Sequence, residues 1–259
     1  MTIIPFFQVD AFAERPLTGN PAAVMPLERW LDEALMQRIA AENNLSETAF
    51  TVPSESDDAD YQLRWFTPTT EVELCGHATI ASGHVLIHGD RVRFSTRSGI
   101  LTVSRNGDLL ELDLPAYPSE PGELPGLQEA LGTKGEVFIS EGGNNSATVL
   151  LADEDAVRAV RPDFAKLKQF DRLVMVTAPG REQDIVSRVF ASYHGIDEDP
   201  VTGSAHAALV PLWAKRLGRD SFTALQASER SGLLHCRLAG DRVILGGHCQ
   251  TVIVGQFQL

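Results

Sequence analysis

The feature that most constrains the fold is an internal repeat whose period is close to half the chain. Residues 98–108 recur at 231–241, an offset of 133, with a Ser-Gly pair near the start and Gly-Asp near the end of each copy. Residues 76–78, Gly-His-Ala, recur as Gly-Ser-Ala at 203–205, an offset of 127. Solenoid repeats are about 20–50 residues long, so a period of this length indicates one domain-sized unit used twice.

Each of these glycine-initiated triplets opens a helical pattern. The first pattern covers 77–88 and the second 204–217, and both are apolar nearly all round. A helix without a polar face must be buried. About half a dozen strand patterns accompany each helix, so the sequence predicts an α+β protein in which each half curls a sheet around one helix. Two halves facing each other would bring together two helix N-termini, which bind anions.

A segment rich in proline and glycine separates the two halves. Residues 115–126 hold four prolines and two glycines, a density typical of an inter-domain linker. We therefore expect an N-terminal half over 1–114 and a C-terminal half over 127–249. The strand pattern within 250–259 is left over after the repeat is counted, and we expect it to pair back onto the first half. Within the second half, the spacing predicts one helix over 154–168.

The composition excludes several classes of partner. The net charge is −13 and the lysines and arginines form no cluster, which argues against nucleic acid and anionic membranes. No apolar run reaches the roughly 18 residues that span a bilayer, and the N-terminus lacks the basic and apolar segments of a signal peptide. Three cysteines fit a reducing compartment better than a disulfide framework. We expect a cytoplasmic protein.

Four stretches, in order along the chain, carry a resemblance to a known family: Val-Asp-Ala-Phe and Gly-Asn-Pro-Ala within 9–22, Asn-Leu-Ser-Glu-Thr-Ala-Phe at 44–50, Leu-Cys-Gly-His-Ala-Thr at 74–79, and Asp-Pro-Val-Thr-Gly-Ser-Ala-His at 199–206. In these stretches the chain resembles the PhzF family, which includes the phenazine-biosynthesis isomerases. The resemblance implies the diaminopimelate epimerase fold. That fold has two pseudo-symmetric halves, each a curled, mostly antiparallel sheet around a central helix, with the site between them.

Glu47 is the first candidate for chemistry. It begins an alternating strand pattern over 46–52, where it could be an ordinary solvated carboxylate. An inward side chain at the head of an apolar strand would be poorly solvated, and desolvation moves carboxyl groups toward the pKa range useful for proton transfer near neutral pH. In the phenazine isomerases the matching Glu takes a proton from one carbon and returns it at another. The resemblance therefore implies that Glu47 is the general base and acid.

Three further residues are implied as partners of Glu47 or of the substrate. His77 lies at the start of the first central helix, where the helix dipole disfavours a cationic imidazole, so we expect a neutral ring. Ser204 occupies the matching place in the second half and could be a simple N-cap. Asp199 precedes that helix and could merely complement its dipole. By resemblance, His77 and Asp199 take part in catalysis and Ser204 contacts the substrate.

Backbone groups complete the predicted binding site. The N–H groups around Gly76 and Gly203, at the two helix starts, would hold a substrate carboxylate. Asn20 is a further candidate for substrate contact, although Gly-Asn-Pro is also ordinary turn chemistry.

Cys75 separates the possible reactions. Racemases and epimerases of this fold use two cysteines, one before each glycine, as opposed acid and base. This chain has Cys75 at the first position but Thr202 at the second, and a threonine hydroxyl cannot be deprotonated as a thiol is. Two-thiol racemisation is therefore excluded, while a dehydratase or a racemase-like reaction with one thiol stays open. Cys75 can equally be a small buried apolar residue, or it can contact the substrate.

The sequence offers little support for a metal or cofactor. His235-Cys236 and His248-Cys249 look like paired ligands, but adjacent residues of a strand point to opposite faces, so neither pair can chelate one ion. Nucleotide-binding glycine motifs do not occur. We predict neither a metal nor a cofactor.

Taken together, these observations predict a cofactor-independent isomerase that moves a proton within a small carboxylate-bearing substrate. By resemblance the type substrate is 2,3-dihydro-3-hydroxyanthranilate, one possibility among several. The alternatives are a racemase- or dehydratase-like activity that uses Cys75 and a non-catalytic protein that binds a small molecule. Homodimers are common among proteins of this fold, and we expect one here.

Overall fold

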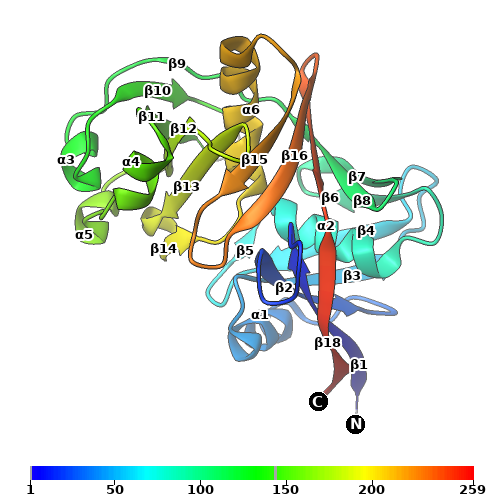
Figure 1. Ribbon diagram of the computed structural model, residues 1–259. Helices are drawn as coiled ribbons and strands as arrows, with labels where there is room; N and C mark the ends of the chain where they lie inside the picture. The colour runs from blue at the N-terminus through cyan, green and yellow to red at the C-terminus, as the bar shows by residue number, and fades with distance from the viewer. Residues whose placement is uncertain (1, 143–144) are drawn as a thin grey trace. The chain divides into compact units, whose positions relative to one another are not determined.

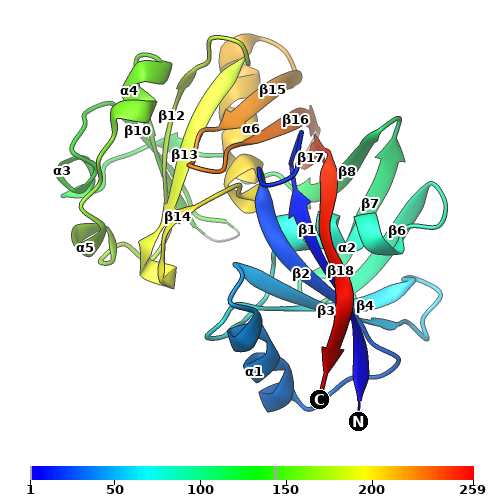
Figure 2. The same ribbon diagram turned by 60° about the horizontal axis from the view of Figure 1, so that its bottom comes forward.

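The computed structural model describes residues 2–142 and 145–259, and it divides into two compact units (Figure 1). Unit 1 comprises Met1–Asp113 and Gly246–Leu259, and unit 2 comprises Leu114–Leu245. The C-terminal strand β18 (Cys249–Gln258) pairs antiparallel with the N-terminal strand β1 (Ile3–Ala11), so both ends of the chain belong to unit 1. Figure 2 shows the two strands side by side, in red and dark blue.

Unit 1 is a mostly antiparallel sheet with two helices. After β1 come β2 (Asn20–Pro26), α1 (Glu33–Asn43), β3 (Glu47–Pro53), β4 (Tyr61–Phe66), β5 (Glu71–Val72), α2 (Gly76–Leu86), β6 (Arg91–Thr96), β7 (Gly99–Asn106) and β8 (Leu109–Pro115). The pairs β2–β3 and β4–β6 are parallel, and the pairs β1–β2, β3–β4, β4–β5, β6–β7 and β7–β8 are antiparallel.

The sheet of unit 1 surrounds α2. This helix contacts β1, β2, β3, β6, β7 and β18, and it is buried along nearly its whole length. Small residues allow the close approach, because a Cβ atom on Gly83 would lie only 2.6 Å from a methyl group of Val103 on β7. On another face, α1 packs Met36 and Ile39 against Phe50 and Phe66. Burial of α2 and of this second cluster holds the strand ends in fixed positions.

Unit 2 repeats the same order of elements. Its elements are β9 (Glu120–Pro121), α3 (Leu127–Leu131), β10 (Glu136–Ser140), β11 (Ser146–Leu150), α4 (Glu154–Ala159), α5 (Phe164–Leu167), β12 (Leu173–Pro179), β13 (Ile185–Ala191), the 3₁₀ turn η1 (Ser192–His194), β14 (Ile196–Asp199), α6 (Gly203–Leu217), β15 (Ser221–Gln226), β16 (Gly232–Ala239) and β17 (Arg242–Gly247). As in unit 1, the second and third long strands, β11 and β12, pair in parallel, and so do β13 and β15. The predicted α+β fold with two similar halves is confirmed.

The segment predicted as a linker is built into unit 2. Residues 120–121 form β9, which pairs with β10, and the backbone N–H of Tyr117 donates to the carbonyl of Ala207 in α6 at 2.9 Å. That carbonyl needs a donor, because Pro211 lies four residues further along α6 and has no N–H. The proline-rich segment thus completes a hydrogen bond that the helix cannot make itself.

One predicted element is wrong. The helix expected over 154–168 is two short helices, α4 and α5, separated by residues 160–163. Pro162 is the physical reason, because proline lacks an N–H and disfavours a helical conformation in the residue before it. The side chain of Asp163 then caps α5 by accepting from the backbone N–H of Lys166. Within the described residues no helix is both long and apolar enough to cross a membrane.

Candidate active site

The central helices of the two units start in the same way. Cys75 is the N-cap of α2, with φ −141° and ψ 107°, and Thr202 is the N-cap of α6, with φ −117° and ψ 105°. Neither side chain caps its helix with a hydrogen bond. Gly76 and Gly203 are therefore the first helical residues, and Ser204 lies one position inside α6 instead of at the predicted N-cap. The repeat in the sequence is a repeat of this backbone conformation.

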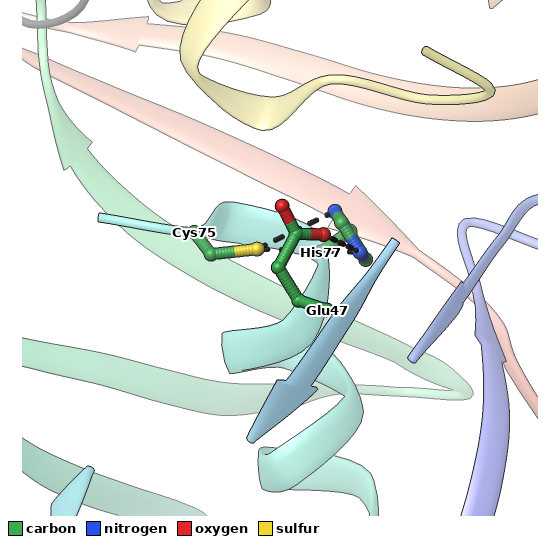
Figure 3. Close-up of side chains that lie close together, drawn as sticks. All are labelled: Glu47, Cys75 and His77. Carbon is green, nitrogen blue, oxygen red and sulfur yellow. Dashed lines mark hydrogen bonds and ion pairs between the residues drawn. The ribbon is translucent and has the colours of Figure 1, made fainter. Parts of the chain in front are cut away.

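Strand pairing brings Glu47 to the start of α2. Glu47 is the first residue of β3, and the parallel pairing with β2 places it opposite Ala22, close to Asn20 at the head of the same strand. Since α2 packs on β2 and β3, its N-terminus lies beside these two strand ends. Figure 3 shows Glu47, Cys75 and His77 converging from β3 and from the start of α2.

The three side chains form a tight buried cluster. Nε2 of His77 lies 3.0 Å from Oε2 of Glu47, and Sγ of Cys75 lies 3.5 Å from Nδ1 and 4.0 Å from Nε2 of the same ring. The exposed fractions are only 9% for Glu47, 6% for Cys75 and 4% for His77. The imidazole therefore stands between a thiol and a carboxylate, which it can contact at the same time.

Two polar residues orient the imidazole. The side-chain amide of Asn20 lies 3.1 Å from Nδ1 of His77, with Nδ2 as its donor, and the hydroxyl of Ser46 donates to Oδ1 of Asn20 at 3.1 Å. In the neutral ring the amide donates to Nδ1, so Nε2 carries the hydrogen that points toward Glu47; in the cationic ring Nδ1 also donates and the amide must turn its oxygen toward it. Asn20 thus contacts the ring of His77, and Ser46 holds Asn20. Ser46 was not among the residues predicted from the sequence, although it directly precedes Glu47.

The pKa values of Cys75 and His77 depend more on their neighbours in the cluster than on the helix dipole. Burial and the charge of Glu47 raise the pKa of the Cys75 thiol to about 11, so the sulfur is protonated at neutral pH. Burial lowers the pKa of His77, but interactions with Cys75 and with the carboxylate of Glu47 outweigh burial and raise this pKa well above its usual value. The neutral ring expected from the helix terminus is therefore not what the structure favours. A carboxylate at 3.0 Å acts more strongly than the partial charge of a helix end.

Unit 2 has a different set of contacts at the matching place. The hydroxyl of Thr202 donates to Oδ2 of Asp199 in a short hydrogen bond. The amide of Gln226 accepts from the backbone N–H of Thr202 at 2.8 Å and donates to the carbonyl of Asp199 at 2.7 Å. The sequence predicted Asp199 as a contact to substrate or a proton-relay partner of Glu47. Within unit 2 its carboxylate bonds to Thr202, and Gln226, far along the chain, closes the network.

His206 lies one turn into α6 and is fully buried. Its Nδ1 is 2.8 Å from the carbonyl of Thr202, whereas Nε2 is buried without a hydrogen-bond partner among the described residues. Burial lowers the pKa of His206 to about 4, so this ring is neutral at physiological pH. The two histidines near the helix starts thus differ in charge because only His77 has a carboxylate beside it.

The histidine-cysteine pairs of the sequence have separate surroundings. Cys236 is buried on β16 while the adjacent His235 is partly exposed, as expected for opposite faces of a strand. His248 lies 2.9 Å from a carboxylate oxygen of Glu14, whereas Sγ of Cys249 contacts the carbonyl of Ile80. Among the described residues, the group of three metal-type ligands within 4.8 Å of one another is Glu47, Cys75 and His77.

Comparisons with known proteins agree with this architecture. An uncharacterized isomerase of Pseudomonas aeruginosa is 51% identical over 263 residues, which cover 99% of both chains. The solved structure of a PhzF-family phenazine biosynthesis protein of Enterococcus faecalis is 44% identical, covers 100% of both chains and superposes with a TM-score of 0.92. A hydroxyproline epimerase of Agrobacterium vitis, 13% identical, shares the fold alone, with a TM-score of 0.63 over 98% of this chain and 92% of that one.

The chain therefore has the fold of the diaminopimelate epimerase type, as the resemblance implied. The sequence profile of the phenazine biosynthesis-like proteins, PhzC-PhzF, matches residues 9–255, and the chain belongs to this family. Membership and the relatives together define it as an isomerase.

Proposed function

We propose that the protein is a cofactor-independent isomerase that moves a proton within a small carboxylate-bearing substrate, with Glu47 as general base and acid. The observation that carries the proposal is the buried carboxylate of Glu47 with Nε2 of His77 at 3.0 Å from one of its oxygens. The other oxygen points away from the ring (Figure 3), and we propose that it takes the proton from carbon. A positioned carboxylate of this kind contributes about 10²–10⁴-fold to rate.

His77 has a defined part in this proposal. As the Nε2–H donor fixed by Asn20, it orients the carboxylate before the reaction. If the ring takes a second proton, Nδ1 becomes a donor, and the amide of Asn20 must turn its oxygen toward it. The hydroxyl of Ser46 can then accept from the turned amide, because hydroxyls both donate and accept. The network can therefore serve either protonation state of His77.

The start of α2 supplies the second component of the proposed mechanism, a place that can bind the substrate carboxylate. The first backbone N–H groups of α2, beginning at Gly76, have no intrahelical acceptor, and the N-cap side chain of Cys75 does not occupy them with a capping bond. Such a terminus stabilises a substrate carboxylate and the charge that develops when a neighbouring carbon loses its proton. For unit 2 we propose the same role for Gly203 and Ser204, with Asp199 as a further substrate or relay group.

The arrangement favours proton movement on one face of the substrate. Glu47, Cys75 and His77 lie within 4.8 Å of one another and so approach a substrate carbon from one side. Racemisation by two bases requires groups on opposite sides of that carbon. The counterpart of Cys75 is Thr202, whose hydroxyl donates to Asp199. The thiol itself, with a pKa of about 11, is a poor base at neutral pH, which weakens the racemase and dehydratase alternatives.

The experiment is deuterium incorporation in D₂O, followed by mass spectrometry. The panel holds small amino and hydroxy acids and 2,3-dihydro-3-hydroxyanthranilate, and wild type runs beside Glu47→Gln and Cys75→Ser. We expect incorporation that Glu47→Gln abolishes and Cys75→Ser retains. Incorporation that needs Cys75 and not Glu47 would overturn the proposal in favour of the thiol. A panel member that binds without exchanging any carbon-bound hydrogen would favour a binding protein. The cytoplasmic location and the homodimer remain predictions.

A further inference from the structure

The cluster at the start of α2 has the composition of a metal site. Sγ of Cys75, a ring nitrogen of His77 and a carboxylate oxygen of Glu47 lie within 4.8 Å of one another. Nε2 of His77 is 3.0 Å from Oε2 of Glu47 and 4.0 Å from Sγ of Cys75. Zn²⁺ binds thiolate sulfur at about 2.3 Å and imidazole nitrogen or carboxylate oxygen at about 2.0–2.2 Å. One ion can therefore reach all three atoms with small side-chain rotations.

The charge balance selects the kind of ion. Once the thiol is deprotonated, Cys75 and Glu47 supply two negative charges and His77 a neutral nitrogen, so a divalent ion would be neutralised inside a buried site. A thiolate and an imidazole favour zinc and similar borderline ions over magnesium or calcium, which prefer oxygen ligands. Oε2 of Glu47 is buried and faces Nε2 of His77 at 3.0 Å, so an ion that replaces the hydrogen on Nε2 would meet both atoms.

The surroundings of His77 fit the second shell of a metal site. A histidine that binds metal through one nitrogen normally gives the hydrogen of the other to an oxygen nearby. Nδ1 of His77 is 3.1 Å from the side-chain amide of Asn20, and Ser46 holds the far end of that amide. With the amide turned, Oδ1 of Asn20 accepts from Nδ1–H while Nε2 binds the ion. Asn20 and Ser46 would thus orient the ligand.

We propose that Glu47, Cys75 and His77 form a three-ligand site for Zn²⁺, and that its occupation inhibits the isomerase. Binding forms one bond each from sulfur, nitrogen and oxygen to the ion, and it releases the thiol proton of Cys75 and the Nε2 proton of the cationic His77 ring to solvent, while Nδ1 keeps its hydrogen. Water can complete the coordination, as in other zinc sites with three protein ligands. The proposed inhibition rests on the proposed function, because the ion would occupy the carboxylate that takes the proton. The proposed zinc binding does not depend on that function.

The test is direct titration of the whole, chelator-treated protein with ZnCl₂ in a calorimeter, with Co²⁺ as a spectroscopic probe. We expect one ion per chain and, with Co²⁺, the near-ultraviolet charge-transfer band of a thiolate ligand. Cys75→Ala should remove the band and weaken binding more than about 100-fold, beyond the 10–100-fold typical of second-shell changes such as Asn20→Leu. Cys249→Ala is the matched control, since Cys249 has its own partner in Ile80, and it should bind as wild type does.

Two results would overturn the site. One is no binding of either ion to the wild type. The other is binding that persists in Cys75→Ala and in His77→Gln, which would place the ion elsewhere. His77→Gln also serves if Cys75→Ala fails to fold, as judged by circular dichroism. Zn²⁺ should then stop deuterium incorporation, and a chelator should restore it. If the metal-free protein exchanges no hydrogen, the proposed function fails while the calorimetric result stands, and if exchange continues with Zn²⁺ bound, the inhibition alone is wrong.

Discussion

The starts of α2 and α6 have the same backbone but different chemistry. In unit 1 the neighbouring strand β3 begins with Glu47, whereas in unit 2 the matching strand β12 begins with the apolar pair Leu173 and Val174. In unit 2, Asp199, Thr202 and Gln226 bond to one another, whereas in unit 1 a buried oxygen of Glu47 faces the ring of His77 at 3.0 Å. The repeat therefore supplies two similar frames, and in the proposed function the carboxylate of Glu47 makes the first of them the site of proton transfer.

The largest effect should come from Glu47→Gln, which keeps the shape of the side chain but removes its charge. We expect the rate of deuterium incorporation to fall by at least about 10²-fold, with little change in the melting temperature. The comparison variant is Asp199→Asn in unit 2, which should lower stability through its bond to Thr202. If Asp199→Asn leaves stability unchanged and lowers the rate as strongly as Glu47→Gln, Glu47 is not set apart from the polar groups of unit 2 as the main acid and base.

The second effect is a pH dependence of stability that comes from His206. Its pKa is about 4 in the folded protein and 6.5 in the unfolded chain, so the unfolded state binds the extra proton between these values. The stabilisation is present above pH 6.5 and is lost as the pH falls toward 4, by about 3 kcal/mol in total. Urea unfolding of wild type and His206→Asn at several pH values measures it. Equal pH dependence in the two proteins would show that the ring is not buried neutral.

A third prediction concerns the satisfied network of unit 2. Thr202→Val keeps the side-chain shape but removes the donor to Asp199. A hydrogen bond to a charged group contributes about 1.5–3 kcal/mol, so the free energy of unfolding should fall by that amount. Cys75→Val is the matched change in unit 1, where the sulfur makes only weak hydrogen bonds, and it should cost less. A larger loss from Cys75→Val would reverse the comparison.

The smallest effect should come from Ser46→Ala. The variant removes the Ser46 donor to Oδ1 of Asn20, so the amide loses one of the contacts that fix its orientation while Glu47 and His77 remain in place. A single neutral hydrogen bond contributes about 0.5–1.5 kcal/mol, which corresponds to a fall in exchange rate of about tenfold or less. The two-dimensional NMR signal of the His77 ring nitrogens should shift at the same time. An unchanged signal would mean that Ser46 does not act on the ring.

Sequence reasoning predicted most of the frame and part of the site. The repeat and the apolar character of residues 77–88 and 204–217 predicted two buried helices, and α2 and α6 lie there with boundaries shifted by one or two residues. The sequence pattern did not predict β13 and β14 as separate strands, and the predicted single helix over 154–168 is wrong because Pro162 interrupts it. The two central helices were predicted correctly because a helix pattern depends on residues close together in the chain.

The sequence by itself determined that the protein is made of two similar α+β units, each with a central helix that begins at a glycine, because the repeat and the apolar pattern are local properties of the chain. The tertiary structure alone decided that Glu47 contacts His77, that Asn20 orients the ring, and that Gln226 closes the network of Asp199. These contacts join residues that are 24 to 57 positions apart in the chain. They depend on the register of paired strands and on helix packing, which act over the whole unit, and the protonation state of His77 follows from them.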